Sequence, residues 1–145
     1  MHTFAAWWHR VVAMNAPRPC PCGTASFADC CGPLLVGARQ AQTAEALMRS
    51  RYTAYLEGAV DYLITTTAAA ARSRLDRAGL VAYCRGLRGI SLRMLEVCGG
   101  GPLEEAGVVE FAATLRAQGR TFVQRERSRF VREQSRWVYV DGEVG

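Results

Sequence analysis

The stretch CPCGTASFADCC, residues 20–31, places four of the chain's six cysteines within twelve positions. The spacing is C-x-C-x7-C-C, so two short pairs are separated by seven residues. Two chelating pairs joined by a turn are what a metal knuckle needs, because the turn brings the pairs face to face around one ion. The spacing therefore predicts that this segment folds around a metal. The predicted ligands are Cys20, Cys22, Cys30 and Cys31.

The residues between and beside the cysteines suit such a turn. Pro19 and Pro21 hold the first pair in an extended path, because proline fixes the backbone angle φ. Gly23 supplies the permissive backbone that is needed just after a ligand. Residues 24–29 are expected to form the linking turn. We expect Gly32-Pro33 to end the unit.

Zinc is the metal that this ligand set favours. A tetrahedral shell of four sulfurs is typical of structural zinc, and the four cysteines complete it without a histidine or carboxylate from elsewhere in the chain. The spacing does not match the usual iron–sulfur runs, and a bridge between the adjacent Cys30 and Cys31 would be strained. Unligated or redox-active thiols are the alternative. Because a filled shell leaves no position for water, we expect a structural zinc ion, one per chain, without a catalytic role.

The composition limits the class of protein. The 145 residues are 50% hydrophobic and 21% charged, which is a globular profile, and no apolar run approaches the ~18 residues of a membrane helix. The formal charge of +5 comes from arginine, because the chain contains no lysine. The arginines are scattered, which favours a compositional bias over a surface for polyanions. Four thiolates on Zn²⁺ would carry −2 and reduce the total from +5 to +3.

The N-terminal residues 1–18 are expected to be a disordered tail, since chain termini are poorly ordered unless they are docked. The stretch lacks the basic start of a signal peptide, and His9 and Arg10 interrupt its apolar run. A short amphipathic helix over residues 7–12, touching a membrane or a partner, is the alternative. Without a targeting signal we expect a cytoplasmic protein, in which thiols stay reduced and clustered cysteines indicate metal ligands.

A strong helical pattern follows the cysteines. TAEALMRSRYTAYLEG, residues 43–58, predicts a helix with Thr43 as its N-cap and Gly58 as its stop. Arg51 lies on the apolar face of this helix, and a buried guanidinium needs a carboxylate partner. Alternatively, Arg51 lies at the edge of that face and reaches water. Two shorter helices are expected before residue 90, with a loop or a helical turn between them.

From Ile90 onward the apolar period changes to two, which predicts strands. The expected strands are residues 90–97, 106–119, 120–134 and 136–142, and Gly119-Arg120 is a hairpin signal. In the third strand, one side is anchored by phenylalanines and is expected to face inward. This side consists of Phe122, Gln124, Glu126, Ser128 and Phe130. It would place Glu126 within reach of Arg51 and would leave the alternate arginines on a solvated outer stripe.

The pattern CPCG…CCG resembles the SEC-C motif, the zinc knuckle named after the C-terminal tail of the SecA motor protein. The family version usually has eight residues between the pairs and Ser-Gly after the first glycine. This chain has seven residues there, and Thr24-Ala25 after the glycine. The missing residue shortens the turn and bears on its geometry more than on the four ligands.

The remaining sequence predicts an α+β fold, because helices come first and a bent antiparallel sheet follows. This order resembles the nuclear-transport-factor-two-like (NTF2-like) cone, in which a curved sheet wraps a long helix and leaves a pocket. Residues 19–142, which are nearly the whole chain, are similar to the YchJ-like family, in which a SEC-C knuckle precedes such a cone. The matching blocks are TAEALMRSRYTAYLEGAVDYLITTT, GVVEFAATLRAQG, ERSRFVRE and RWVYVDG. The resemblance implies a knuckle over residues 19–36 and an NTF2-like domain over residues 37–145. Where the family often has a Trp and a His-Pro, this chain has Thr65-Thr66-Thr67 and alanines.

Three functions follow as hypotheses, and the first is preferred because the metal shell is expected to be closed and the sequence shows no catalytic constellation. It is a non-enzymatic interaction or adaptor module, whose knuckle recognises a protein or the ribosome, as the likeness to the SecA tail implies. The second is small-molecule binding, or hydrolase or isomerase chemistry, in the cone pocket. Fold alone does not imply such a function, and both histidines lie in the tail. The candidate pocket residues are Arg51, Tyr52, Tyr55, Asp61, Glu126 and Asp141.

The third hypothesis is nucleic-acid binding through the outer arginines of the third strand. These are Arg125, Arg127 and Arg129, with Arg132 following. Phosphate contacts would make such binding fall steeply with salt. No aromatic residue interleaves the row, so stacking on bases has no support, and this function is the least favoured of the three.

Overall fold

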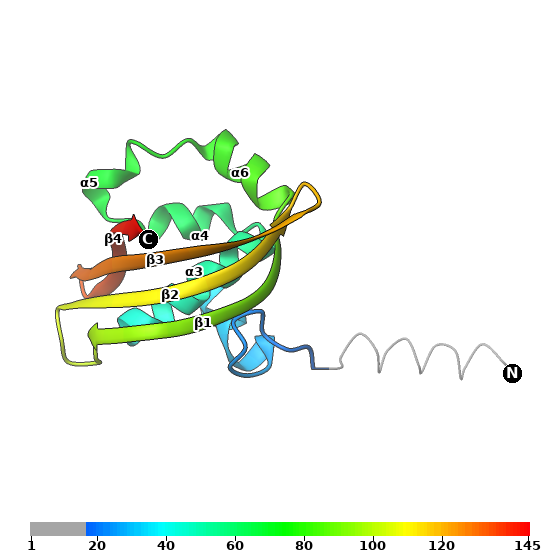
Figure 1. Cartoon of the computed structure of the whole chain (residues 1–145). Helices are drawn as coiled ribbons and strands as arrows, with labels where there is room; N and C mark the ends of the chain where they lie inside the picture. Colours follow the sequence, from blue (N-terminus) through cyan, green and yellow to red (C-terminus); the bar gives the residue numbers. More distant parts are fainter. Residues whose placement is uncertain (1–16) are drawn as a thin grey trace, which may run out of the picture.

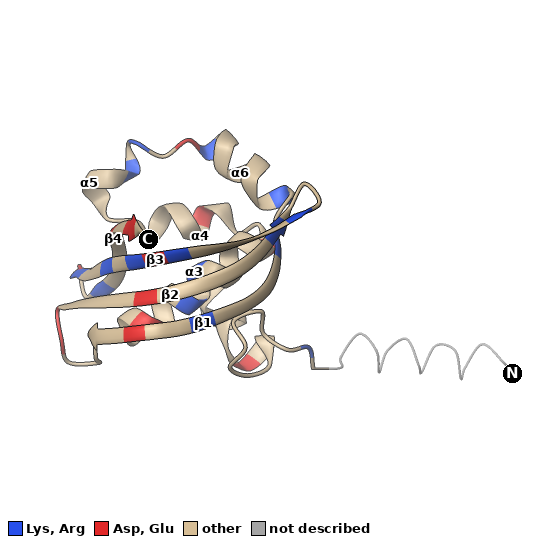
Figure 2. Cartoon of the chain, viewed as in Figure 1, with Lys and Arg blue, Asp and Glu red and all other residues tan. Residues whose placement is uncertain are grey.

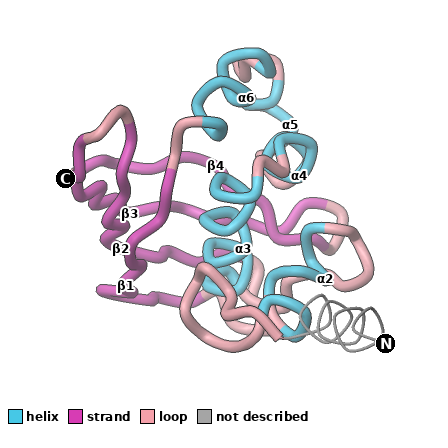
Figure 3. Tube along the Cα trace, turned by 90° about the vertical axis from the view of Figure 1, so that its right-hand side faces the viewer, coloured by secondary structure: helices cyan, strands magenta, loops and turns pink. Residues whose placement is uncertain are grey.

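The computed structural model of the protein describes residues 17–145, and most of the expected N-terminal tail, with its helical alternative, lies outside the described residues. One curved sheet wraps a long helix, as Figures 1 and 3 show. The short 3-10 helix η1 and the helices are η1 Phe27–Asp29, α2 Cys31–Leu35, α3 Ala44–Glu57, α4 Val60–Thr65, α5 Ala69–Arg72 and α6 Arg77–Arg85. The strands are β1 Arg88–Gly99, β2 Ala106–Ala117, β3 Arg120–Glu133 and β4 Arg136–Val144.

The four strands form a single antiparallel sheet in the order β1-β2-β3-β4. Irregularities in register bend the sheet, because a bulge adds a residue to one strand and increases the local twist. Two lie in β1, between Gly89 and Ser91 and between Met94 and Glu96. A third lies where β3 pairs with β4. The mixed α+β architecture with a bent antiparallel sheet confirms the predicted fold class.

Helix α3 is the centre of the fold. The Thr43 hydroxyl accepts a hydrogen bond from the backbone N–H of Ala46 at 3.0 Å, and Gly58 ends the helix with a φ of +71°. Both caps were expected from the sequence, because threonine accepts from the first turn and glycine adopts the left-handed conformation at little cost. The apolar face of α3, including Leu47 and Met48, packs against Phe130 and other residues of the sheet.

Strand β3 follows the predicted alternation. Glu126, Ser128 and Phe130 are buried, whereas Arg125, Arg127 and Arg129 are exposed. Because side chains of a strand point alternately to opposite faces, the inner face meets α3 and the outer face meets solvent. Phe122, near the hairpin tip, belongs to the inner set but is 36% exposed.

One local expectation is wrong. Gly32 and Pro33 do not end the knuckle, because both lie inside α2, which runs from Cys31 to Leu35. Proline is tolerated in the first turn of a helix, where its missing N–H has no helical partner to bond. The knuckle therefore ends in a helical turn and not in an immediate loop.

A close backbone approach joins the β1–β2 connection to the start of α3. Gly100 is buried with a φ of +75°, and its carbonyl accepts from the backbone N–H of Ala44 at 2.9 Å. A methyl group on Gly100 would lie 2.5 Å from Cβ of Ala44. Only glycine fits this position without a shift of the helix or of the connection.

We predict that Gly100→Ala lowers the free energy of unfolding more than Gly119→Ala does. Both glycines have nearly the same φ, +75° and +74°, so both variants carry about 1–2 kcal/mol of left-handed strain. A methyl at Gly119 meets open space, whereas at Gly100 overpacking adds roughly 1–3 kcal/mol. Urea denaturation of the two variants measures the difference, and equal losses would show that the approach to Ala44 is not tight.

Candidate functional site

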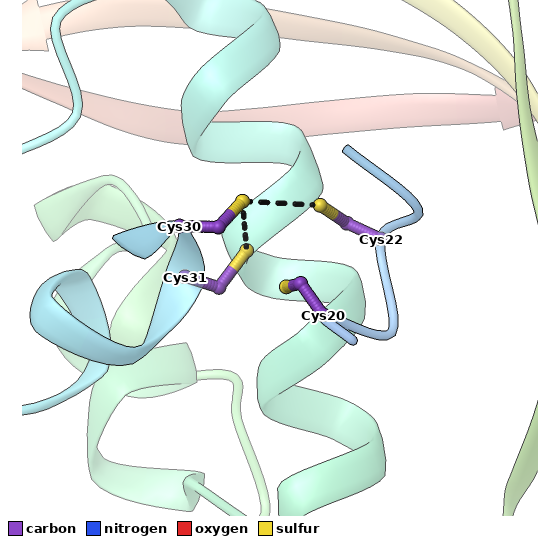
Figure 4. Close-up of side chains that lie close together, drawn as sticks. All are labelled: Cys20, Cys22, Cys30 and Cys31. Carbon is purple, nitrogen blue, oxygen red and sulfur yellow. Dashed lines mark hydrogen bonds between the residues drawn. The ribbon is translucent and has the colours of Figure 1, made fainter. Parts of the chain in front are cut away.

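The four cysteines of the knuckle converge, as Figure 4 shows. Their sulfur atoms all lie within 4.8 Å of one another, with 3.4 Å between Cys22 and Cys30 and 3.9 Å between Cys30 and Cys31. A tetrahedral shell with Zn–S bonds of about 2.3 Å has sulfur–sulfur edges of about 3.8 Å, whereas a disulfide needs about 2.05 Å. The cluster therefore has the spacing of a metal shell and not of a disulfide pair. Cys20, Cys22 and Cys31 are buried, and Cys30 is half-buried.

Backbone hydrogen bonds of the knuckle fix the positions of the first pair of cysteines. Cys20 N–H donates to the carbonyl of Ala25 at 2.8 Å, and Gly23 N–H donates to the carbonyl of Cys20 at 2.9 Å. Gly23 has a φ of +86°, which confirms the expected need for glycine directly after Cys22. The 3-10 helix η1 then leads to the second pair, and Cys31 is the first residue of α2. The seven-residue turn therefore still brings both pairs together.

Helix α3 supplies the rest of the environment of the cluster. The hydroxyl of Thr53, which is fully buried, lies 3.7 Å from Sγ of Cys20. Nη1 of Arg49 donates to the carbonyl of Cys22 at 3.0 Å. The three buried cysteines belong to the same apolar cluster as the inner residues of α3. A metal ion bound by the four sulfurs would thus lie between the knuckle and α3.

Thr53 and Arg49 were not predicted from the sequence. They are four residues apart, so they lie on one side of α3. That spacing is the signal that could have marked a second polar face of the helix. A shell of four thiolates around Zn²⁺ would carry −2, and the positive charge of Arg49 beside it would reduce the cost of burying that charge.

The thiols of the cluster compete for protons. A hydrogen bond from Cys31 is the main reason that the pKa of Cys22 is lowered to about 4. Burial raises the pKa of Cys30 to about 11, and the hydrogen bond with Cys22 raises the pKa of Cys31. Without a cation, the thiolate of Cys22 is thus held beside the thiols of Cys30 and Cys31. Because metal ligation needs thiolates, binding of an ion would release the remaining protons.

A separate cavity of about 360 Å³ lies between α3, α6 and the inner face of the sheet. Four of the six predicted pocket residues line it, namely Arg51, Tyr52, Tyr55 and Glu126. Its walls are mainly apolar and aromatic, with Leu80 and Tyr83 of α6 on one side. The structure thus brings the centre of the predicted pocket together.

Asp61 and Asp141 lie outside this cavity. Asp61 is exposed on α4 and forms an ion pair with Arg77. Asp141 is exposed on the outer face of the sheet, paired with Arg129. Asp141 faces outward because of the bulge in β4. Tyr139 is opposite Phe130, but Asp141, two residues further on, is opposite Arg129. One extra residue reverses the alternation, so counting in twos from Tyr139 gives the wrong face.

Arg51 is buried without the carboxylate partner that we expected, and it does not reach bulk water at an edge. It is only 8% exposed, and its Nη1 donates to the carbonyl of Leu63 at 2.9 Å and to the hydroxyls of Thr66 at 2.7 Å and Thr67 at 3.4 Å. No carboxylate oxygen in the described part of the chain lies within ion-pair distance of Arg51. Burial lowers the pKa of its guanidinium. Thr66, Thr67 and the carbonyl of Leu63 are therefore the partners of this charge.

Tyr139 connects Arg51 with Glu126. The guanidinium carbon of Arg51 lies 4.7 Å from the centre of the Tyr139 ring, and the Tyr139 hydroxyl donates to Oε1 of Glu126 at 2.7 Å. Burial, followed by this hydrogen bond, raises the pKa of Tyr139. Arg51 and Glu126 thus interact through an aromatic ring and not through a direct ion pair, which corrects the expectation of direct contact.

The outer arginines form the predicted solvated stripe, and their charges are compensated. Figure 2 shows red and blue residues side by side on neighbouring strands. Each arginine of the row pairs with a carboxylate across the sheet: Arg125 with Glu110 at 2.8 Å, Arg127 with Glu96 at 3.2 Å, and Arg129 with Asp141 at 2.5 Å. Arg132 lies over the ring of Trp137 at 4.5 Å. Little unpaired positive charge is left for phosphates.

Over residues 17–145, every helix is too short or too polar to cross a membrane.

Comparison with known proteins gives concordant relatives. The family model described as "YchJ, middle NTF2-like domain" matches residues 43–142. A UPF0225 protein of Methylibium petroleiphilum is 41% identical over 132 residues, which cover 91% of this chain and 93% of that protein. A UPF0225 protein of Geobacter sulfurreducens is 41% identical over 124 residues, with 85% and 77% covered.

Two solved structures share the architecture. The solution structure of a SEC-C motif containing protein from Rhodopseudomonas palustris has a TM-score of 0.79 and 37% identity, and the match covers 88% of this chain and 99% of that one. The crystal structure of a SEC-C motif containing protein from Psychrobacter arcticus has a TM-score of 0.75 and 25% identity, with 88% and 83% covered. Four converging cysteines beside an NTF2-like domain agree with both neighbours. The chain therefore belongs to the YchJ-like family, whose UPF0225 relatives it matches over most of their length.

Proposed function

We propose that the four cysteines hold one structural zinc ion, and that the knuckle organised by this ion is a non-enzymatic interaction module. The observation that carries the proposal is the mutual distance of the four sulfurs, at most 4.8 Å, with three of the four cysteines buried. A shell filled by four sulfurs offers zinc no position for water or substrate, so the ion would stabilise the knuckle and would not catalyse. The proposal places the protein in the cytoplasm, where thiols stay reduced.

The surface that would meet a partner is the exposed tip of the knuckle. Its exposed residues between the two cysteine pairs are Gly23, Thr24, Ala25, Ala28 and Asp29. None of them is a predicted ligand, and apart from Gly23, whose φ of +86° requires glycine, their side chains are free to vary with the partner. The resemblance to the SecA tail favours a protein or ribosomal partner. Nucleic acid is disfavoured because the outer arginines are paired with carboxylates.

We predict about one zinc ion per purified chain. Cys30→Ser is expected to reduce the zinc content severely, because a serine hydroxyl is a poor ligand beside three thiolates. Cys98→Ser is the matched control, since Cys98 is exposed on β1 and lies outside the cluster. Metal analysis by mass spectrometry decides the matter. Metal-free wild-type protein, or equal zinc in both variants, would contradict the assignment.

Thr53→Val tests whether α3 supports the metal shell. The substitution keeps the volume of a fully buried side chain but removes the hydroxyl 3.7 Å from Sγ of Cys20. Loss of an outer-shell partner typically costs about 10–100-fold in metal affinity, and we expect at least the lower figure. Competition with a chromogenic chelator measures the affinity. Thr65→Val, at an exposed position of α4, is the control and should leave it unchanged.

Ala28→Arg tests the interaction surface without touching a ligand. Ala28 is exposed in η1, so the variant should retain its zinc and its fold. In affinity capture from native extract, the variant is expected to lose the specific partner that the wild-type protein retains. Ala70→Arg, exposed on α5, should retain it. The same set of captured proteins with Ala28→Arg as with wild type would remove the knuckle tip as the interaction surface.

A further inference from the structure

The guanidinium of Arg51 is only partly used by the protein. All three of its hydrogen bonds leave from Nη1. Among residues 17–145, Nε and Nη2 have no hydrogen-bond partner, yet neither atom is sealed from solvent. Because Arg51 is only 8% exposed and lines the cavity, this access must lead into the cavity. A guanidinium edge with two free N–H donors has the geometry to bind a carboxylate with two parallel hydrogen bonds.

Glu126, the other charged residue of the cavity, is better satisfied. Its carboxylate accepts from the Tyr139 hydroxyl at 2.7 Å, the Ser128 hydroxyl at 3.1 Å and the Gln124 amide at 3.2 Å. A carboxylate has about four acceptor sites, so three of them are taken. Most of the unfilled hydrogen-bonding capacity of the cavity is therefore on Arg51, with two free nitrogens, and less on Glu126, with one free acceptor site, which favours an anionic ligand over a cationic one.

Glu126 also limits the charge that a ligand can carry. Arg51 and Glu126 together give the cavity a net charge near zero. A monoanion adds one negative charge, and the ring of Tyr139 stands between Arg51 and Glu126. A dianion such as a phosphate ester would meet stronger repulsion from Glu126 at low dielectric. A planar carboxylate, which matches the fork of Arg51, is the anion that these residues fit best.

The walls of the cavity select an apolar body. Tyr52 and Tyr55 of α3, Tyr83 of α6 and Phe111 of β2 surround the volume of about 360 Å³. The rings of Tyr55 and Tyr83 meet edge to face with centroids 5.9 Å apart. Tyr83 is 44% exposed, so it stands at the mouth of the cavity. The volume lies near the lower end of the roughly 300–1,000 Å³ of small-molecule sites, which suits a body the size of one ring.

We propose that this cavity binds a small monocarboxylate with an apolar body about the size of a benzene ring. The carboxylate pairs with the Nε–Nη2 edge of Arg51, and the body lies between the tyrosines of α3 and α6. This inference goes beyond the interaction function of the knuckle and does not depend on zinc, since Arg51 and the four cysteines lie on different sides of α3.

Three matched probes test the charge preference on the full-length wild-type protein: phenylacetate, its neutral isostere phenylacetamide, and the cation phenethylamine. Amide resonances of Ala113 and Leu115, which line the cavity, report binding in heteronuclear NMR titrations. We expect saturable shifts with phenylacetate. The affinity for phenylacetamide should be at least about tenfold lower than that for phenylacetate, because hydrogen bonds to a charged group are lost. Tighter binding of phenethylamine, equal binding of phenylacetamide, or no saturable shifts with phenylacetate would each overturn the proposal.

Two variants locate the charges. Arg51→Lys keeps the positive charge but lacks the planar fork, and it should weaken phenylacetate binding by about tenfold. Glu126→Gln removes the repulsive charge, so the affinity for phenylacetate should stay the same or increase. Arg129→Gln, on the outer face, is the control and should leave the affinity unchanged. Unaltered binding in Arg51→Lys, or loss of binding in a folded Glu126→Gln variant, would contradict the assigned roles. If Arg51→Lys does not fold, the three wild-type titrations still decide.

Discussion

The N-terminal part of the fold depends on how the mutual repulsion of four clustered thiolates is overcome. Thiolates within 4.8 Å of one another cannot all ionise in a buried place unless a cation lies between them. The knuckle has few apolar residues of its own, and its turn is fixed by a handful of backbone bonds, such as that from Cys20 to Ala25. A divalent ion would turn this weak arrangement into a rigid one. Its position against α3 would then link knuckle and domain.

Helix α3 serves two sites at once. Arg49 and Thr53 face the cysteines, whereas Arg51, Tyr52 and Tyr55 line the cavity. Residues 49 and 53 are one turn apart, and residue 51 lies between them in sequence, on the other side of the helix. The knuckle and the cavity therefore share helix α3 as a wall, and Met48 and Tyr52, which line the cavity, belong to the same apolar cluster as the buried cysteines. This arrangement permits an interaction function at one site and ligand binding at the other, each tested separately.

The features that could be predicted from the sequence are those that depend on residues close together in the chain. The caps of α3 at Thr43 and Gly58, and the alternation of β3, depend on neighbours within one element. The partners of Arg51 could not be predicted, because the carbonyl of Leu63 and the hydroxyl of Thr66 reach it only through the packing of α4. The position of Thr53 beside Cys20 could not be predicted either, because the knuckle packs on α3 through a tertiary contact. Asp141 faces outward because of a bulge that the residue types in β4 do not predict.

The central claim is that four sulfurs, and nothing else, coordinate the metal. X-ray absorption at the zinc edge of the purified wild-type protein tests it most directly. The account predicts a first shell of four sulfur atoms at about 2.3 Å and no nitrogen or oxygen neighbour. A shell that contains nitrogen or oxygen at about 2.0–2.1 Å, or fewer than four sulfurs, would contradict it.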